Sequence, residues 1–134
     1  MTSTVERNRA VAKALYENLK AGNLAAVLAS FDEDIEIHEP DCLPYGGVYR
    51  GIDGVKKLFA QAAQHLDSRV FDVQSILSEG DRVVAIIQTV TRGARTPVLL
   101  AEESILRDGK LWRVRVYLFD PTVVINASAA RKST

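Results

Sequence analysis

The fold of this 134-residue chain is decided by residues 98–119, which read VLLAEESILRDGKLWRVRVYLF. On both sides of Asp108-Gly109, apolar and polar side chains alternate with the period of a β-strand. An Asp-Gly step between two alternating runs is typical of a tight hairpin. We therefore predict strands over 98–107 and 111–119, paired antiparallel.

Working outward from the hairpin, two upstream runs at 70–77 and 83–90 also predict strands. Residues 35–39 predict another, because apolar and polar side chains alternate there as well. Residues 41–50 are rich in glycine and proline turn signals and predict a loop. Everything after residue 67 is thus predicted to be a meander of strands.

The first 66 residues instead carry apolar side chains at helical spacing and predict about three helices. Ser3 and Glu6 form a capping box at the start of the first helix, and Gly22 ends it. A second helix is predicted over 24–31 and a third over 51–66. Helices followed by strands are typical of an α+β fold with the helices on one face of the sheet.

Composition and charge limit the possible functions. The chain is 47% hydrophobic and 25% charged, which fits one globular domain, placed here at 1–125, with a flexible tail at 126–134. Basic and acidic residues both total 17, so the excess of positive charge that a general nucleic-acid binder needs is missing. No apolar run approaches the roughly 20 residues of a membrane span. Residues 1–9 are polar where a secretory signal is apolar, and Cys42 has no second cysteine to pair with, so we expect a cytoplasmic protein.

Several stretches resemble the nuclear transport factor two-like superfamily, and within it the SnoaL-like polyketide cyclases and ketosteroid isomerases. They are LKAGNL at 19–24, FDEDIEIHEP at 31–40, YRGIDGV at 49–55, RDGK at 107–110 and FDP at 119–121. The resemblance implies a cone, in which a curved antiparallel sheet wraps over the helices and encloses an apolar pocket. It also implies a homodimer and a small hydrophobic ligand. It does not fix an activity, because this fold carries isomerases, cyclases, hydrolases and proteins that only bind.

Glu39 is the first candidate catalytic residue. Strand alternation places it on the same face as Ile35 and Ile37, which we expect to face the core. A carboxyl group in an apolar pocket has a raised pKa and can exchange protons near neutral pH. The Glu39-Pro40 pair also resembles the aspartate-proline pair that carries the proton-shuttling base of the ketosteroid isomerases. The alternative is a solvated carboxylate at the end of a strand.

Glu102 is the second candidate catalytic residue. Counted back from the hairpin, it resembles the second acid of the isomerases, which stays protonated and donates a hydrogen bond to an enolate oxygen. A difference of one residue in the hairpin would put Glu103 in this place. The alternative for either residue is a cross-strand ion pair with Arg113 or Arg115.

Further pocket residues follow from strand alternation and from the loop. Five side chains share one face of the last strand and are predicted to line the pocket, with a packed core as the alternative for the apolar four: Trp112, Val114, Val116, Leu118 and Asp120. Tyr45 and Tyr49 lie where the loop would cover the pocket mouth. Tyr16 is a further candidate for the pocket. By resemblance, the oxyanion-binding tyrosine of the isomerases falls at position 15, where this chain has Leu15. Tyr16 lies about 100° around the helix from that position.

We predict neither a metal nor any other cofactor. His38 and Glu39 point to opposite faces of their strand, so the two do not easily share one ion. Cys42 has no histidine base nearby, since His65 belongs to a distant helix.

The sequence thus predicts a small-molecule enzyme that transfers a proton within an apolar carbonyl compound, by isomerisation or cyclisation. Acid and base are side chains, so the reaction needs no cofactor. A non-catalytic binding module for a small hydrophobic ligand is the alternative. An epoxide hydrolase-like enzyme is a variant that requires an Asp-Arg-Asp cluster.

Overall fold

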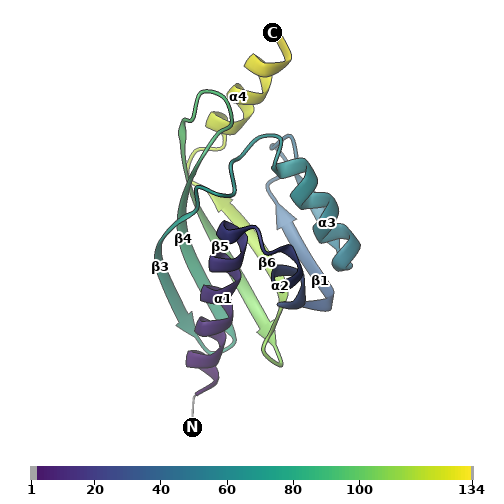
Figure 1. The fold of residues 1–134 in the computed structure, drawn as a ribbon, viewed down its shortest axis with the longest axis vertical. Coiled ribbons are helices and arrows are strands. Elements are labelled where there is room, and N and C mark those ends of the chain that lie inside the picture. Colours follow the sequence, from purple (N-terminus) through teal and green to yellow (C-terminus); the bar gives the residue numbers. More distant parts are fainter. Residues whose placement is uncertain (1–2, 134) are drawn as a thin grey trace.

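A computed structural model describes residues 3–133, and for residues 129–133 it describes the backbone alone. The chain forms, in order, α1 (Thr4–Ala21), α2 (Leu24–Ala29), β1 (Phe31–Glu39), β2 (Gly47–Arg50), α3 (Gly51–Ala62), β3 (Asp72–Glu79), β4 (Arg82–Val90), β5 (Pro97–Arg107), β6 (Lys110–Leu118) and α4 (Thr122–Ser133). Figure 1 shows the curved sheet with the helices, and the two ends of the chain at opposite ends of the molecule.

The six strands form one sheet in the order β2-β1-β6-β5-β4-β3. Neighbouring strands run antiparallel except β1 and β6, which are parallel. The predicted α+β fold with a curved, largely antiparallel sheet is confirmed. The parallel pair was not predicted, because the two strands are far apart in sequence and no turn relates their directions.

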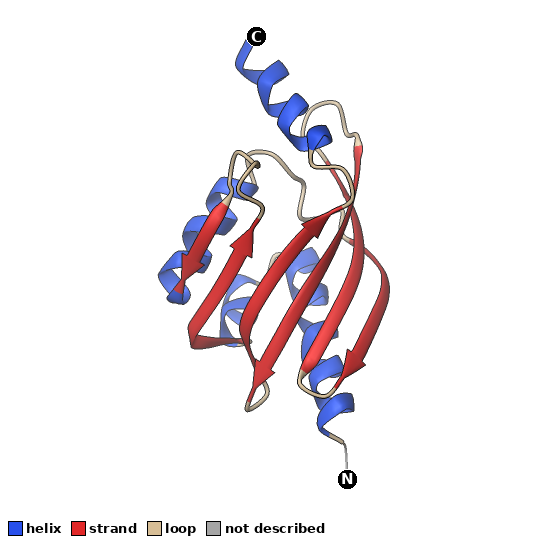
Figure 2. Ribbon diagram, turned by 180° about the vertical axis from the view of Figure 1, so that it is seen from behind, coloured by secondary structure: helices blue, strands red, loops and turns tan. Residues whose placement is uncertain are grey.

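Helices α1, α2 and α3 cover one face of the sheet, and the view from behind shows the other face free of helices (Figure 2). The core lies between the two layers, and its most deeply buried side chains include Ile35, Val55, Ile87 and Leu111. None of the helices within residues 3–133 has both the length and the hydropathy needed to cross a membrane.

The predicted boundaries of α1 follow from its end residues. The Ser3 side chain accepts a hydrogen bond from the Glu6 backbone N–H at 3.1 Å, so the expected cap is present at the helix start. At the other end Gly22 adopts a left-handed conformation with φ of 76°, which residues with a Cβ seldom adopt. The buried face between these caps contains Ala12, Leu15 and Tyr16.

The Asp108-Gly109 hairpin is confirmed, but strand alternation beyond it is not regular. Asp108 and Gly109 have φ of 52° and 77°, as a two-residue hairpin turn with matching twist requires. Ile105 then pairs with Arg113 whereas Leu106 pairs with Leu111, so Trp112 is an extra residue in β6. This β-bulge lets both Leu111 and Val114 point inward and turns Trp112 outward.

Three segments differ from the sequence prediction. Residues 47–50, predicted as loop, form the edge strand β2 because they pair with the end of β1. Strand β1 begins at Phe31, ahead of the start predicted at Ile35, and its register to β6 shifts between Phe31 and Glu36. The segment 126–134, predicted to be a flexible tail, is helical as far as Ser133 as part of α4. Its flexibility stays a prediction, and Thr134 lies outside the described residues.

We expect Ile87→Ala to lower the free energy of unfolding by about 2–5 kcal/mol, since Ile87 is fully buried in the middle of the sheet and its truncation leaves a cavity. Leu77→Ala is the matched control, because Leu77 on β3 is 55% exposed and its loss should cost less than about 0.5 kcal/mol. Chemical denaturation of both variants measures the difference. Equal losses would contradict the assignment of the core.

Candidate functional site

A cavity of about 290 Å³ lies between the concave face of the sheet and the helices. Its wall is largely apolar and comes from both layers, including Leu15, Leu19, Val27, Phe31, Leu58, Phe59, Leu66, Phe71, Leu100, Leu111, Val114, Val116 and Leu118. Two acidic side chains, Glu39 and Glu102, also line it. No described side chain in the wall is a lysine, arginine or histidine. The cavity therefore combines low polarity with two carboxyl groups and no compensating positive charge.

Glu39 reaches this cavity from the last position of β1. Ile35 and Ile37 precede it on the same face and are almost completely buried, as strand alternation predicts. Its Oε2 atom is buried and forms no hydrogen bond with any described residue. Burial, and secondly repulsion from Glu102, raise the pKa of Glu39 to about 8. A carboxyl group with this pKa is present in both its protonated and its ionised form near neutral pH.

Glu102 lies in the middle of β5, opposite Ala85 on β4 and Val116 on β6. The Tyr16 hydroxyl donates a hydrogen bond of 2.9 Å to its Oε1 atom. Burial raises the pKa of Glu102, and the Tyr16 hydrogen bond partly opposes this rise. Glu103 points to the other face, where its Oε2 is 2.7 Å from Arg82 Nη1. Of the two residues that the sequence left open, the one in the cavity is Glu102.

The two carboxyl groups differ in how their charge is stabilised. Glu102 accepts a hydrogen bond, which favours its ionised form, whereas the buried oxygen of Glu39 has no donor among the described residues. The negative charge of Glu102 in turn raises the pKa of Glu39. A charge on Glu102 therefore makes Glu39 a stronger base.

Tyr45 also lines the cavity, from the loop that follows β1. Burial, followed by the negative charges of Glu39 and Glu102, raises the pKa of its hydroxyl. The hydroxyls of Tyr16 and Tyr49 donate hydrogen bonds to Glu102 Oε1 and to the Tyr45 carbonyl oxygen, and neither tyrosine belongs to the cavity wall. Leu15, which takes the place of the isomerases' tyrosine, does line the cavity.

Comparison with known proteins agrees with this architecture. The sequence pattern of the SnoaL-like domain matches residues 12–116. This chain belongs to the SnoaL-like family. It matches no curated protein.

Solved structures share the fold of this SnoaL-like chain. An NTF2-like protein from Burkholderia xenovorans shares 19% identity over 92% of this chain and 96% of its own, with a TM-score of 0.76. Bal32a, from a soil-derived mobile gene cassette, shares 18% identity over 90% of this chain and 95% of its own, with a TM-score of 0.81. TerC, co-crystallised with polyporic acid, shares 20% identity over 90% of this chain and 97% of its own, with a TM-score of 0.80.

Besides Tyr16 and Tyr49, two further residues predicted to line the pocket of this SnoaL-like chain lie elsewhere. Trp112 is on the outer face, with the guanidinium carbons of Arg113 and Arg107 at 4.0 Å and 4.9 Å from its ring centroid. The bulge in β6 turned it outward. Asp120 lies beyond the end of β6, where it accepts hydrogen bonds from Thr122 at the start of α4. Val114 and Leu118 do line the cavity.

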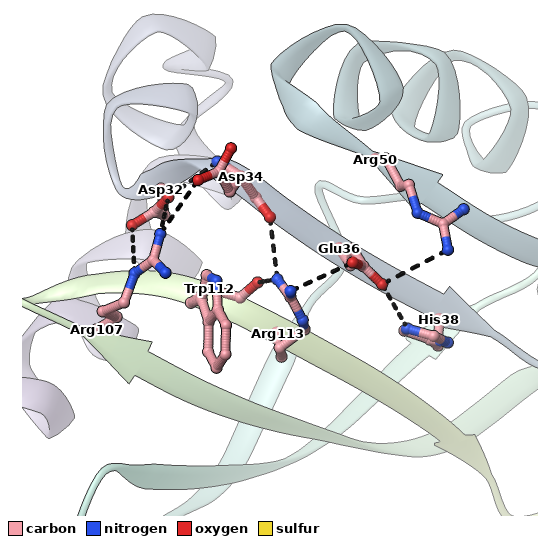
Figure 3. Close-up of polar contacts among 8 residues, drawn as sticks. All are labelled: Asp32, Asp34, Glu36, His38, Arg50, Arg107, Trp112 and Arg113. Atoms are coloured by element: carbon pink, nitrogen blue, oxygen red, sulfur yellow. Dashed lines mark hydrogen bonds and ion pairs between the residues drawn. The ribbon is translucent and has the colours of Figure 1, made fainter.

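The outer face of β1 and β6 carries a separate network of charges (Figure 3). Glu36 lies within 4.0 Å of three cationic or titratable partners, His38, Arg50 and Arg113. Arg107 pairs with Asp32 at 3.0 Å. Within residues 3–133 no group of three or more metal-binding side chains comes together, and Cys42 is exposed. These groups are separate from the cavity.

The sequence did not identify the helical and loop side chains of the cavity wall, such as Phe59, Leu66 and Phe71. Helical spacing showed that Phe59 and Leu66 face inward, but it does not distinguish a packed core from the wall of a cavity. Only the distance between the two layers determines that difference.

Glu39 should make the stability of the protein depend on pH. Its pKa is about 8 in the folded protein and about 4.3 in an unfolded chain. Between these values the folded state holds the proton more tightly, so the free energy of unfolding falls as pH rises and levels off above the folded pKa. Denaturation at about pH 5 and about pH 9 should show a loss on the order of a few kcal/mol.

The loss of unfolding free energy between about pH 5 and about pH 9 should be smaller in Glu39→Gln, because the amide does not ionise. It should not vanish, because Glu102 is also buried. Glu79→Gln, on the exposed end of β3, is the matched control and should behave like the unmodified protein. An identical pH dependence in Glu39→Gln and the unmodified protein would show that Glu39 is solvated.

Proposed function

We propose that this chain is an enzyme that transfers a proton within an apolar carbonyl compound, without a cofactor, leading to isomerisation or ring closure. Glu39 is its general base. The observation that carries the proposal is the unpaired, buried oxygen of Glu39 at the wall of an apolar cavity. A buried carboxylate without a donor is costly to maintain unless a ligand interacts with it.

The basicity of Glu39 supports this role. With a pKa of about 8, it is ionised in a useful fraction of molecules near neutral pH and is a stronger base than a solvated carboxylate. Positioned acids and bases of this kind contribute about 10²–10⁴-fold to a reaction rate.

The charge of the cavity supports an uncharged substrate. An anionic group inside would meet two carboxyl groups and no cationic side chain among the described residues of the wall. Burying a charge without a partner costs on the order of several kcal/mol. A neutral ketone or aldehyde with an apolar body avoids this cost and fills a cavity of about 290 Å³.

In the proposed reaction the Glu39 carboxylate removes a proton from the carbon next to the carbonyl group. The electrons of the broken C–H bond form a C=C bond, and the carbonyl π electrons move to oxygen, giving an enolate. Glu39 then returns the proton to another carbon, which completes an isomerisation. Alternatively, the enolate carbon attacks a second carbonyl carbon and closes a ring, the π electrons of that carbonyl move to its oxygen, and the resulting alkoxide takes the proton back from Glu39. Atoms and charge balance without any oxidant or reductant.

Glu39→Gln should lower turnover on the order of 10²-fold or more while leaving ligand affinity nearly unchanged, because the amide keeps the shape of the side chain but is not a base. β-Tetralone, a neutral bicyclic ketone, is a suitable probe. Its α-protons exchange with deuterated solvent each time the enolate forms, and proton nuclear magnetic resonance measures the rate. Exchange at the unmodified rate in Glu39→Gln would contradict the role of Glu39.

A non-catalytic binding module is the second candidate. The apolar cavity favours it, as does Leu15 at the place of the isomerases' oxyanion tyrosine. TerC, which shares the fold, was crystallised with polyporic acid. Binding of β-tetralone without any Glu39-dependent exchange would support this alternative. The epoxide hydrolase variant is disfavoured, because the described cavity wall holds neither arginine nor aspartate.

We further propose that the protein is a homodimer that pairs through the outer face of the sheet. Large apolar side chains are exposed there or at its margin: Leu99 at 39%, Val48 at 42%, Tyr117 at 47% and Phe119 at 84%. A group of such residues on a sheet face not covered by helices is typical of a contact surface. Regular alternation from the hairpin would put Leu111 on this face as well, but it points inward because of the bulge in β6.

Light scattering should therefore give the mass of a dimer at micromolar concentration, and Phe119→Asp should shift it toward the monomer, since a buried unpaired charge opposes association. Leu24→Asp is the matched control, because Leu24 is 50% exposed on α2, on the helical side of the sheet. A monomeric mass for the unmodified protein would contradict the dimer.

A further inference from the structure

The proposed reaction creates a negative charge on the substrate oxygen, and that charge needs a hydrogen-bond donor. In apolar surroundings a well-placed donor of this kind is often the largest single contribution to catalysis. The sequence suggested Glu102, Tyr16, Tyr45 and Tyr49 as candidates. The structure places these four groups differently enough to choose among them.

Two of the tyrosines are engaged elsewhere. The Tyr49 hydroxyl lies 2.8 Å from the Tyr45 carbonyl oxygen and 2.9 Å from Gln61 Oε1. The Tyr16 hydroxyl donates to Glu102 at 2.9 Å. Neither residue belongs to the described wall of the cavity. A substrate oxygen in the cavity would reach neither hydroxyl without breaking these contacts.

Glu102 lines the cavity, but its Oε1 atom already accepts the Tyr16 hydrogen bond, which opposes part of the rise that burial causes in its pKa. The hydrogen bond from Tyr16 stabilises the ionised form. An ionised Glu102 would repel an enolate. Its effect on the proposed reaction is therefore electrostatic, because its charge strengthens Glu39 as a base.

Tyr45 remains, and its loop holds it firmly in the wall. Gly46 N–H bonds to the Leu43 carbonyl, and Leu43 N–H bonds to the Pro40 carbonyl, so the loop forms two consecutive turns. A Cβ atom at position 46 would lie 2.3 Å from the Pro40 carbonyl oxygen, so this close approach requires glycine. The Tyr45 ring is 2% exposed and packs at 5.8 Å, centroid to centroid, from the ring of His65.

We infer that the Tyr45 hydroxyl donates the hydrogen bond that stabilises the enolate oxygen, an inference that rests on the function proposed above. As Glu39 takes the α-proton, the carbonyl oxygen gains the π electron pair and accepts the Tyr45 hydrogen bond. The phenolic O–H bond does not break, and the proton stays on Tyr45 throughout. Burial and the nearby carboxyl groups keep this hydroxyl protonated, since they raise its pKa. The donor thus comes from the loop after β1 and not from the first helix.

The test compares Tyr→Phe variants in two measurements on β-tetralone. The first is the rate of α-proton exchange with deuterated solvent. The second is the carbonyl stretching band of the bound ketone, measured by isotope-edited infrared spectroscopy, which shifts to lower frequency when a hydrogen bond is donated to the oxygen. Tyr117→Phe is the matched control, because Tyr117 is half-exposed on the outer face and its hydroxyl contacts Glu103.

Tyr45→Phe should slow exchange on the order of 10²-fold and move the carbonyl band back toward its value in an apolar solvent. Tyr117→Phe should change neither measurement. Tyr16→Phe should leave the carbonyl band unchanged, because its hydroxyl contacts Glu102 instead of the ligand. Circular dichroism of each variant confirms that the fold is retained, and Tyr45→His provides a second variant with a donor if Tyr45→Phe unfolds.

The outcomes separate the two proposals. Glu39-dependent exchange together with unchanged rate and carbonyl band in Tyr45→Phe would overturn the role of Tyr45 and leave the proposed function intact. Absence of Glu39-dependent exchange would overturn the proposed function, and the carbonyl band would then still decide whether Tyr45 bonds the ligand oxygen. A cavity that does not bind β-tetralone at millimolar concentration would contradict both.

Discussion

Two carboxyl groups share one apolar cavity, and the free energy of ionising them links the fold to the proposed chemistry. Glu102 lies on β5, between β4 and β6, and Glu39 is the last residue of β1, which lies on the other side of β6. Helices α1 to α3 close the space above them (Figure 1). Since no cationic side chain is present in the described wall, only the Tyr16 hydroxyl stabilises a charge on the pair. The architecture thus makes one carboxylate tolerable and the second one strongly basic.

The two faces of β1 show how strongly the surrounding side chains affect a glutamate. Glu36 and Glu39 lie on one strand three positions apart and point to opposite faces. Glu36 has His38, Arg50 and Arg113 around it, as Figure 3 shows. Glu39 has no partner for its buried oxygen. Ion pairs near the surface contribute only about 0–1 kcal/mol each, so the outer network adds little to stability.

The sequence predicted the position of Glu39 because β1 is regular from Ile35 to its end, and alternation is then a reliable guide. The sequence did not predict which face Trp112 points to, because a β-bulge shifts the register by one residue and has no signature in the residue pattern. Strand alternation also stops at the end of a strand, which is why Asp120 belongs to the cap of α4 instead of the cavity. The three-dimensional distance between layers, which no one-dimensional pattern contains, determined which core residues became the wall of a cavity.

The contact between Tyr16 and Glu102 was also beyond sequence reasoning, although it affects the base indirectly. Helical geometry puts Tyr16 about 100° from Leu15, so Tyr16 does not face the cavity. Its long side chain nevertheless reaches Glu102 from behind the cavity wall. By favouring the ionised form of Glu102, this hydroxyl raises the basicity of Glu39. Stronger desolvation alone would make Glu39 a stronger base but leave fewer molecules ionised at neutral pH. A pKa of about 8 is close to the value at which these two effects balance. A tyrosine outside the cavity can therefore tune a base inside it, without contacting the ligand.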